Sequence, residues 1–237
     1  RTGLDAGHGV DGRVDTDRIA SPFDYAQQVL LGLPTDIPEP GAPYYEDSVV
    51  HAVTDAIGVA QGRTFVLFTS YRQLNRVADR VQQLLGGDFR ILRQGELPRD
   101  QLLRTFVAGH RTALFGTDSF WEGVDVRGQA LSCVILPRLP FRVPSEPVQV
   151  ARAERIEERG GNSFSDLSVP QAVLKFRQGF GRLIRHRDDR GVVIVLDRRI
   201  MTKRYGRKFL GSLPEDLVPR RVPMGEFLRE MDAFLPR

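Results

Sequence analysis

The sequence of 237 residues has little of several features that define common protein classes. Its one cysteine, Cys133, allows neither an intrachain disulfide nor a cysteine-based metal cluster, and a reducing cytoplasm suits such a chain. Its four histidines are scattered, without the spacing of zinc ligands. No apolar stretch is long enough to cross a membrane, and the first residues do not resemble a secretory signal. We therefore expect a cytoplasmic protein with no metal site of its own and no membrane anchor.

The composition predicts a globular protein with a slight positive charge. Hydrophobic residues make up 41% and charged residues 27%, which is enough for a core and too apolar for a disordered chain. The formal net charge is +4. This charge fits an anionic partner such as nucleic acid, and it fits an arginine-rich composition without such a partner equally well.

Short apolar runs alternate with amphipathic segments along most of the chain. Strands are predicted at 28–33, 64–70, 89–95, 112–117, 130–137 and 191–197. Helices are predicted at 46–60, 71–87, 97–109 and 168–186, and two amphipathic segments close the chain. Such alternation is typical of an α/β fold in which a mostly parallel sheet is covered by helices on both faces. We expect about six or seven strands.

The segments that follow the strands hold much of the unusual chemistry of this sequence. In an open parallel sheet, ligands bind at the edge formed by the carboxyl ends of the strands. We expect the segments that follow five of the predicted strands to lie together at this edge. They are 69–72, 94–96, 116–125, 137–147 and 197–199.

The stretch "QGFGRLIR", residues 178–185, sets arginines beside glycines. In one continuous helix, Gln178, Arg182 and Arg185 share a face. The opposite, apolar face carries Phe176, Phe180 and Leu183. Guanidinium groups can bind phosphate oxygens bidentately, so this face suits a nucleotide. A solvated cationic face near a helix end is the alternative interpretation.

Four motifs resemble superfamily 2 helicases of the DinG/XPD family, and in particular the bacterial DinG type. Residues 178–185 resemble motif VI in the form that this family uses, and "GTDSFWEGVDVRG", residues 116–128, resembles motif V. "FVLFTSYRQL", residues 65–74, resembles motif IV, and residues 137–147 resemble the stretch after motif V. The resemblance runs from about Ser21 to Leu213, with the motifs in the family's order and spacing.

The resemblance implies the second RecA-like domain of an ATP-dependent helicase that moves 5′→3′ along single-stranded DNA. It implies the end of a preceding domain or a linker at 1–21, the RecA-like domain at 22–213 and a helical extension at 214–237. ATP with Mg²⁺ would lie between this domain and an upstream RecA-like domain of the same protein. We expect a monomer.

The resemblance also assigns site residues. Arg182 and Arg185 match the family's arginine fingers, and Gln178 matches its nucleotide-site glutamine. The residues that match the connection between the nucleotide cleft and the DNA track are Glu122, Gly123 and Asp125. Judged from the residues alone, Glu122 and Asp125 could also serve as an acid–base pair, orient Arg182 or Arg185, or lie near the ribose.

A second set of residues is expected to contact DNA. The resemblance gives this role to the loop formed by Thr69, Ser70 and Tyr71, although Ser70 could equally be a helix N-cap. Further expected contacts are Gln94, Trp121, Arg138, Phe141 and Arg142. Trp121 and Phe141 could stack on bases, and the two arginines could bind phosphates. A tryptophan after a buried strand can also belong to the core.

The sequence lacks GxxxxGK[ST], a DEAH-like acidic motif and the cysteines of an iron–sulfur cluster. In the resembled family these belong to the other helicase domain. We therefore expect a C-terminal domain that does not hydrolyse ATP alone. The alternative is a non-catalytic nucleic-acid-binding module, which would not need two arginines directed toward an empty cleft. A complete small-molecule enzyme would need a phosphate loop or an activated nucleophile, and we find neither.

Overall fold

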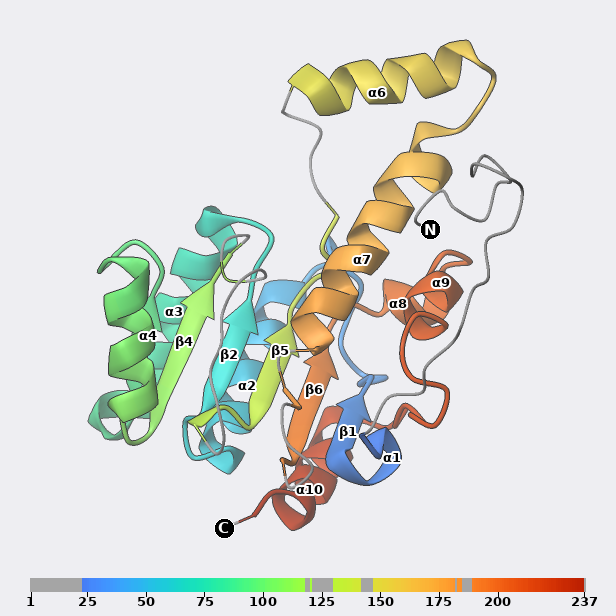
Figure 1. Ribbon diagram of the computed structural model, residues 1–237. Coiled ribbons are helices and arrows are strands. Elements are labelled where there is room, and N and C mark those ends of the chain that lie inside the picture. Colours follow the sequence, from blue (N-terminus) through green and yellow to red (C-terminus); the bar gives the residue numbers. More distant parts are fainter. Residues whose placement is uncertain are drawn as a thin grey trace, which may run out of the picture.

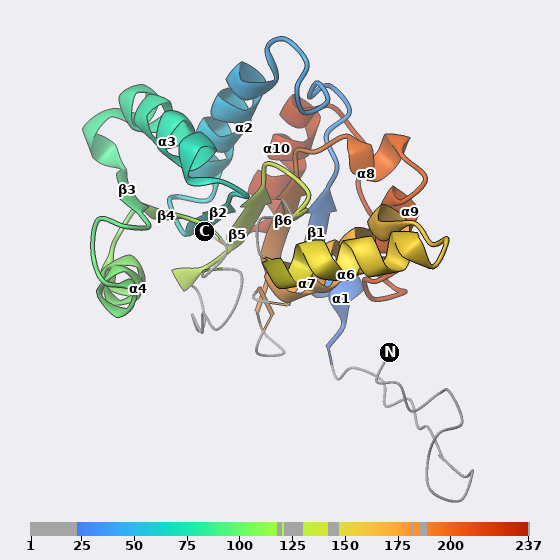
Figure 2. The ribbon, with the colours of Figure 1, turned by 90° about the horizontal axis from the view of Figure 1, so that it is seen from above.

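One six-stranded parallel sheet organises the computed structural model, which describes residues 23–117, 120, 130–141, 147–181, 183–184 and 189–236. The strand order is β1-β6-β5-β2-β4-β3, and every pairing is parallel. Figures 1 and 2 show helices on both faces of this sheet. The predicted α/β class and strand number are confirmed.

The elements follow the predicted alternation closely. The strands are β1 (Val29–Gly32), β2 (Thr64–Leu67), β3 (Arg90–Arg93), β4 (Thr112–Gly116), β5 (Cys133–Leu136) and β6 (Gly191–Val195). The longer helices are α2 (Tyr45–Val59), α3 (Tyr71–Leu85), α4 (Arg99–Ala108), α6 (Pro147–Glu158), α7 (Val169–Phe180) and α10 (Met224–Phe234). The short helices are α1 (Tyr25–Gln28), α8 (Arg199–Thr202) and α9 (Gly206–Leu210).

The strands are apolar without interruption because both faces of the sheet are buried. In β2, Phe65 and Leu67 face a core with α4, α7 and α9, whereas Val66 faces a core with α2, α3 and α10. Successive side chains of a strand point to opposite faces, so each strand supplies both cores. This explains why the strands read as short continuous apolar runs in the sequence.

The C-terminal segment covers one edge of the sheet. The backbone of Arg220 accepts from the Leu33 N–H and donates to the Leu31 carbonyl, at 2.8 Å each, so it extends the sheet beyond β1. Helix α10 then buries Phe227 and Met231 in the core shared with α2. Residues after 213, which the sequence analysis set apart as an extension, thus pack into the same core as the sheet.

Helix α7 is shorter than the sequence pattern predicts. It ends at Phe180, where Gly181 donates to the Arg177 carbonyl, and the predicted continuation to 186 is not helical at Leu183 and Ile184. These two residues are buried, and Leu183 lies against Gly191 at the start of β6. Burial of these two apolar side chains stabilises the chain more than further helical turns would, because Gly179 and Gly181 already weaken the predicted helix.

Helix α6 was not predicted from the sequence. It has no fully buried residue, and in Figure 1 it lies beyond the N-terminal end of α7, away from the sheet. Its apolar residues are too few to give a periodic pattern, so no amphipathic signal marks it. Among the residues that the structure describes, no helix has both the length and the apolar character needed to cross a bilayer.

Candidate nucleotide and nucleic-acid site

The segments after β2, β3 and β4 meet at the carboxyl edge of the sheet through Gln94. Its side-chain oxygen accepts from the backbone N–H of Thr117 at 2.6 Å and from the Thr117 hydroxyl at 3.0 Å. Its side-chain nitrogen donates to the hydroxyl of Tyr71. One glutamine therefore joins the three segments that were predicted to carry DNA contacts.

The loop after β2 combines a helix cap with an exposed aromatic residue. The Ser70 hydroxyl accepts from the Gln73 N–H at 3.3 Å, so Ser70 is the N-cap of α3. Thr69 is half-buried, and the next residue, Tyr71, is 51% exposed. The cap fixes where α3 begins and thereby holds Tyr71 at the surface beside Gln94.

An open hollow of about 570 Å³ lies over this part of the edge. Tyr71 and Gln94 line it together with the pair formed by Arg93 and Asp79. Glu96 also faces Arg93, with an oxygen 3.6 Å from its Nε. The carboxylates neutralise the arginine, so this hollow offers a ligand mainly the uncharged polar groups of Tyr71, Asn75 and Gln94.

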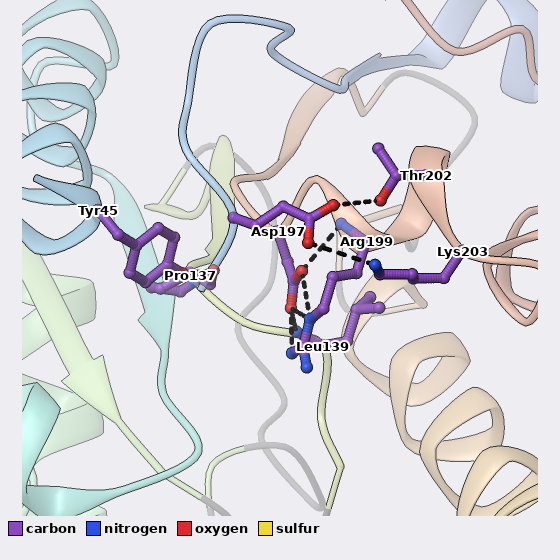
Figure 3. Close-up of polar contacts among 8 residues, drawn as sticks. Tyr45, Pro137, Leu139, Asp197, Arg199, Thr202 and Lys203 are labelled. Atoms are coloured by element: carbon purple, nitrogen blue, oxygen red, sulfur yellow. Dashed lines mark hydrogen bonds and ion pairs between the residues drawn. The ribbon is translucent and has the colours of Figure 1, made fainter. Parts of the chain in front are cut away.

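The loop after β5 is held from two sides. On one side, the Tyr45 hydroxyl of α2 donates to the Pro137 carbonyl (Figure 3). Arg138 follows, with its guanidinium carbon 5.4 Å from the centre of the Tyr45 ring. Burial raises the pKa of the Tyr45 hydroxyl above its usual value, so it remains a hydrogen-bond donor at neutral pH.

On the other side of the loop, the carboxylate of Asp197 ties it to the end of β6. Asp197 is fully buried and accepts from the Leu139 N–H at 2.9 Å (Figure 3). The Arg199 guanidinium binds the same carboxylate, with Nε and Nη2 at 2.9 and 2.6 Å from its two oxygens. The hydrogen bond to Asp197 raises the pKa of Arg199, which stays charged.

The sequence pattern placed residues 197–199 at the functional edge only as a segment and indicated no role for Asp197. One feature of the sequence could have indicated this role: Asp197 directly follows a wholly apolar strand. A carboxylate at such a position is buried only if it has a partner for its charge. The partner lies two residues away, yet the accepting role toward Leu139 links positions 58 apart in the chain. Only the fold could reveal that link.

Phe141, a predicted base-stacking residue, lies in an aromatic cluster. Its ring centre is 5.5 Å from that of Phe164, at an interplanar angle of 26°, and 5.3 Å from that of Tyr205. Phe209 packs against it from α9 at 5.7 Å. Phe141 is half-buried, whereas Phe164, in the turn before α7, is 45% exposed.

The predicted nucleotide residues are only partly within the described structure. Gln178 is exposed on α7, while Phe176 and Phe180 are buried, as the helical pattern predicts. The other residues assigned to the nucleotide or the DNA lie outside the described residues. They are Arg182, Arg185, Glu122, Gly123, Asp125, Trp121 and Arg142. Within the described ranges, no group of three or more His, Cys, Asp or Glu side chains could hold a metal ion.

A family model described as the helicase C-terminal domain matches residues 53–216. Among curated proteins, the ATP-dependent DNA helicase YoaA of Haemophilus influenzae is 43% identical, with 82% of this chain and 30% of that protein covered. The ATP-dependent DNA helicase DinG of Photobacterium profundum is 42% identical, with 83% and 29% covered. The 3'-5' exonuclease DinG of Bacillus subtilis is 38% identical, with 84% and 22% covered. The chain thus spans less than a third of the length of these relatives.

Solved structures support the fold. An XPD helicase superposes with a TM-score of 0.62 at 17% identity, covering 81% of this chain and 35% of that one. The C-terminal domain of the DEAD-box protein Dbp5 superposes with a TM-score of 0.55 at 15% identity, covering 90% of this chain and all of that domain. The parallel sheet fits the fold of these structures, and relatives of the chain are named DinG and YoaA helicases. With the family model matching 53–216, the chain belongs to the helicase C-terminal domain family.

Proposed function

We propose that this chain is the second motor domain of an ATP-dependent DNA helicase that moves 5′→3′ along single-stranded DNA. The observation that carries the proposal is the family match over 53–216, together with relatives that are named ATP-dependent DNA helicases. The four helicase motifs of the sequence all fall within that matched range. The chain spans under a third of those relatives, so we assign the activity to the larger protein.

In this proposal the chain supplies cations to a nucleotide held by another domain. Arg182 and Arg185 offset the negative charge that develops on the terminal phosphate, and Gln178 contacts the nucleotide. Gln178 is exposed near the carboxyl end of α7, which is compatible with this role. Glu122, Gly123 and Asp125 would connect this cleft to the DNA.

The DNA track would run along the carboxyl edge of the sheet. Thr69, Ser70, Tyr71 and Gln94 would contact it on the side of the hollow. Arg138 and Phe141 would do so after β5, where Tyr45 and Asp197 hold the loop. Trp121 and Arg142 complete the proposed set.

The remaining parts of the site belong to the rest of the protein. ATP supplies the energy and Mg²⁺ screens its phosphates when both are bound, and the first RecA-like domain would hold them. An iron–sulfur cluster, where a relative has one, would lie outside this chain. We propose that the protein acts as a monomer in a reducing cytoplasm, which its buried thiol suits.

The proposal is tested by restoring the missing domain. The chain alone should show no ATPase activity, and adding the matching upstream domain should produce turnover that rises with single-stranded DNA. Phosphate release is the measurement. A joined pair of folded domains that binds DNA and shows no DNA-dependent turnover would favour the alternative of a binding module.

Arg182→Ala in the intact helicase tests the arginine role directly. We expect DNA-stimulated ATPase activity to fall about 10³- to 10⁵-fold, because an arginine finger supplies charge where the transferring phosphate needs it. Arg182→Lys should recover little, since an ammonium lacks the planar fork of a guanidinium. Arg177→Ala, at an exposed arginine of α7 five positions earlier in the sequence, is the matched control and should keep near-normal turnover. Equal activity in the Arg182 and Arg177 variants would contradict the assignment.

A further inference from the structure

The segment that follows β6 carries a dense group of cations that the proposed function does not use. Six basic residues lie between positions 198 and 208, and no acidic residue occurs from 198 to 214. Four of the six are exposed at the surface around α9. We call them the basic face, and they are Lys203, Arg204, Arg207 and Lys208.

Among the residues that the structure describes, most of this face has no carboxylate partner. Some surface arginines elsewhere in the chain are paired, such as Arg76 with Glu46 at 2.6 Å and Arg80 with Asp47 at 2.7 Å. On the basic face, Lys203 lies 3.6 Å from Glu39. Within the described residues, the other three make no ion pair. Concentrated, uncompensated positive charge favours an anionic polymer as ligand.

An exposed aromatic residue lies next to the basic face. The ring of Phe164 lies 5.4 Å from that of Tyr205, which stands between Arg204 and α9. Phe164 is 45% exposed, and Phe141 supports it from behind in a stacked arrangement. An open ring backed by other aromatic residues is a rigid platform for an unpaired base.

The fold brings these residues together from distant parts of the chain. Phe209 of α9 packs edge-on against Phe176 of α7 at 5.5 Å, so α9 lies against the helix that follows Phe164. Gly206 allows the return of α9 onto α8, because a Cβ there would lie 2.1 Å from the carbonyl oxygen of Ile200. In Figure 2, α8 and α9 lie beside α6 and α7, opposite α3 and α4 across the molecule.

We propose that Phe164 and the basic face form a binding surface for single-stranded DNA. The four cations contact consecutive phosphates, and Phe164 stacks on an unpaired base. This assignment rests on the proposed function and extends its DNA track past Phe141, to elements that were given no part in it. The aromatic platform is the reason for a single strand, because bases in a duplex do not present a free face.

The charge contribution is tested with the 237-residue chain and fluorescent oligothymidine. Arg207→Gln with Lys208→Gln should weaken binding at low salt and flatten the dependence of log K on log salt by about 1.4, at about 0.7 per lost single-strand contact. Arg104→Gln with Arg229→Gln removes the same charge from exposed positions on α4 and α10. This control should leave both quantities close to those of the unchanged chain.

The stacking contribution is tested by Phe164→Ala against Leu174→Ala, which removes an exposed apolar side chain that is 59% accessible on α7. Phe164→Ala should weaken binding of the single strand about 5- to 100-fold and leave duplex binding nearly unchanged. Phe164→Trp should restore it. Melting temperatures verify that each variant is folded.

The outcomes separate this inference from the proposed function. Unchanged single-strand affinity in Phe164→Ala, or equal losses in the two charge variants, would overturn the surface while the unchanged chain still binds DNA. Equal losses for single strand and duplex in Phe164→Ala would overturn the assignment to unpaired bases. A chain that binds no DNA even at low salt would count against the proposed function, and this surface would fall with it.

Discussion

At the scale of single residues, Asp197 has the most demanding environment among the described residues. A fully buried carboxylate is costly unless its charge is paired and its oxygens accept hydrogen bonds. Asp197 meets both conditions through the Leu139 N–H and the bidentate Arg199 guanidinium. The same carboxylate holds the loop after β5, which carries Arg138 and Phe141. The interactions of Asp197 therefore contribute both to the stability of the fold and to the position of these two residues.

Asp197→Ala is expected to lower the free energy of unfolding by about 3–5 kcal/mol, since it leaves Arg199 and Leu139 without their acceptor. Arg199→Lys should cost less, because it keeps the charge and loses only the fork. Urea unfolding measures both. Arg76→Ala, at a surface pair, should cost about 1 kcal/mol or less. A loss of that small size in Asp197→Ala would show that the buried pair contributes no more than a surface one.

At the scale of secondary-structure elements, the contact between β1 and α10 decides how the C-terminal segment joins the domain. Phe227 packs directly over Gly32, where a Cβ would lie 2.4 Å from the ring. The backbone of Arg220 pairs with the same strand. The Arg220 guanidinium also forms an ion pair with Glu230 of α10, with Nη2 and Oε1 2.6 Å apart. Helix α10 can therefore pack closely on β1 because Gly32 has no side chain.

Gly32→Ala should reduce the free energy of unfolding by about 1–3 kcal/mol, because the added methyl group overpacks the contact with Phe227. Phe227→Leu in the same chain should recover part of the loss. Gly58→Ala provides a control of opposite sign: its added Cβ meets nothing within 4 Å, and alanine favours α2 by about 0.5–1 kcal/mol. Chemical denaturation of the three variants tests this packing, and a neutral Gly32→Ala would disprove it.

At the scale of the whole molecule, Cys133 reports on global unfolding. It lies in β5, a central strand, and burial raises the pKa of its thiol to about 12. The reactive thiolate is therefore scarce in the folded protein, and the sulfur is inaccessible. We expect almost no reaction with iodoacetamide at pH 8 in buffer and complete reaction through the urea transition. Rapid alkylation in buffer would mean that the centre of the sheet opens locally.

The same thiol predicts how stability depends on alkaline pH. The folded pKa is raised above the ordinary value of 9.0, so the unfolded chain loses the proton first. Stability from the protonated thiol is complete below about pH 9 and is lost as the pH rises toward 12. Urea titrations at pH 8 and pH 10 should show a decline that is smaller in Cys133→Ala. An identical decline in both proteins would assign it to other groups.

The sequence determined the order and type of the main elements, because burial on both faces of a parallel sheet imposes short apolar runs that local pattern reveals. It also determined the family, since helicase motifs are local strings of residues. The end of α7 could not be read this way. Its helical pattern continues to 186, and only the packing of Leu183 on Gly191 shows that the chain turns at Gly181.

Tertiary structure alone decided which distant residues share an environment. Local sequence placed Gln94, Tyr71 and Thr117 after three strands, but their mutual hydrogen bonds depend on strand order. Likewise, the sequence pattern gives no sign that Phe164 lies beside the basic residues after β6, which are about 40 positions away in the chain. They adjoin because α9 packs on α7, a contact between segments whose separation along the chain leaves no periodic trace in the sequence.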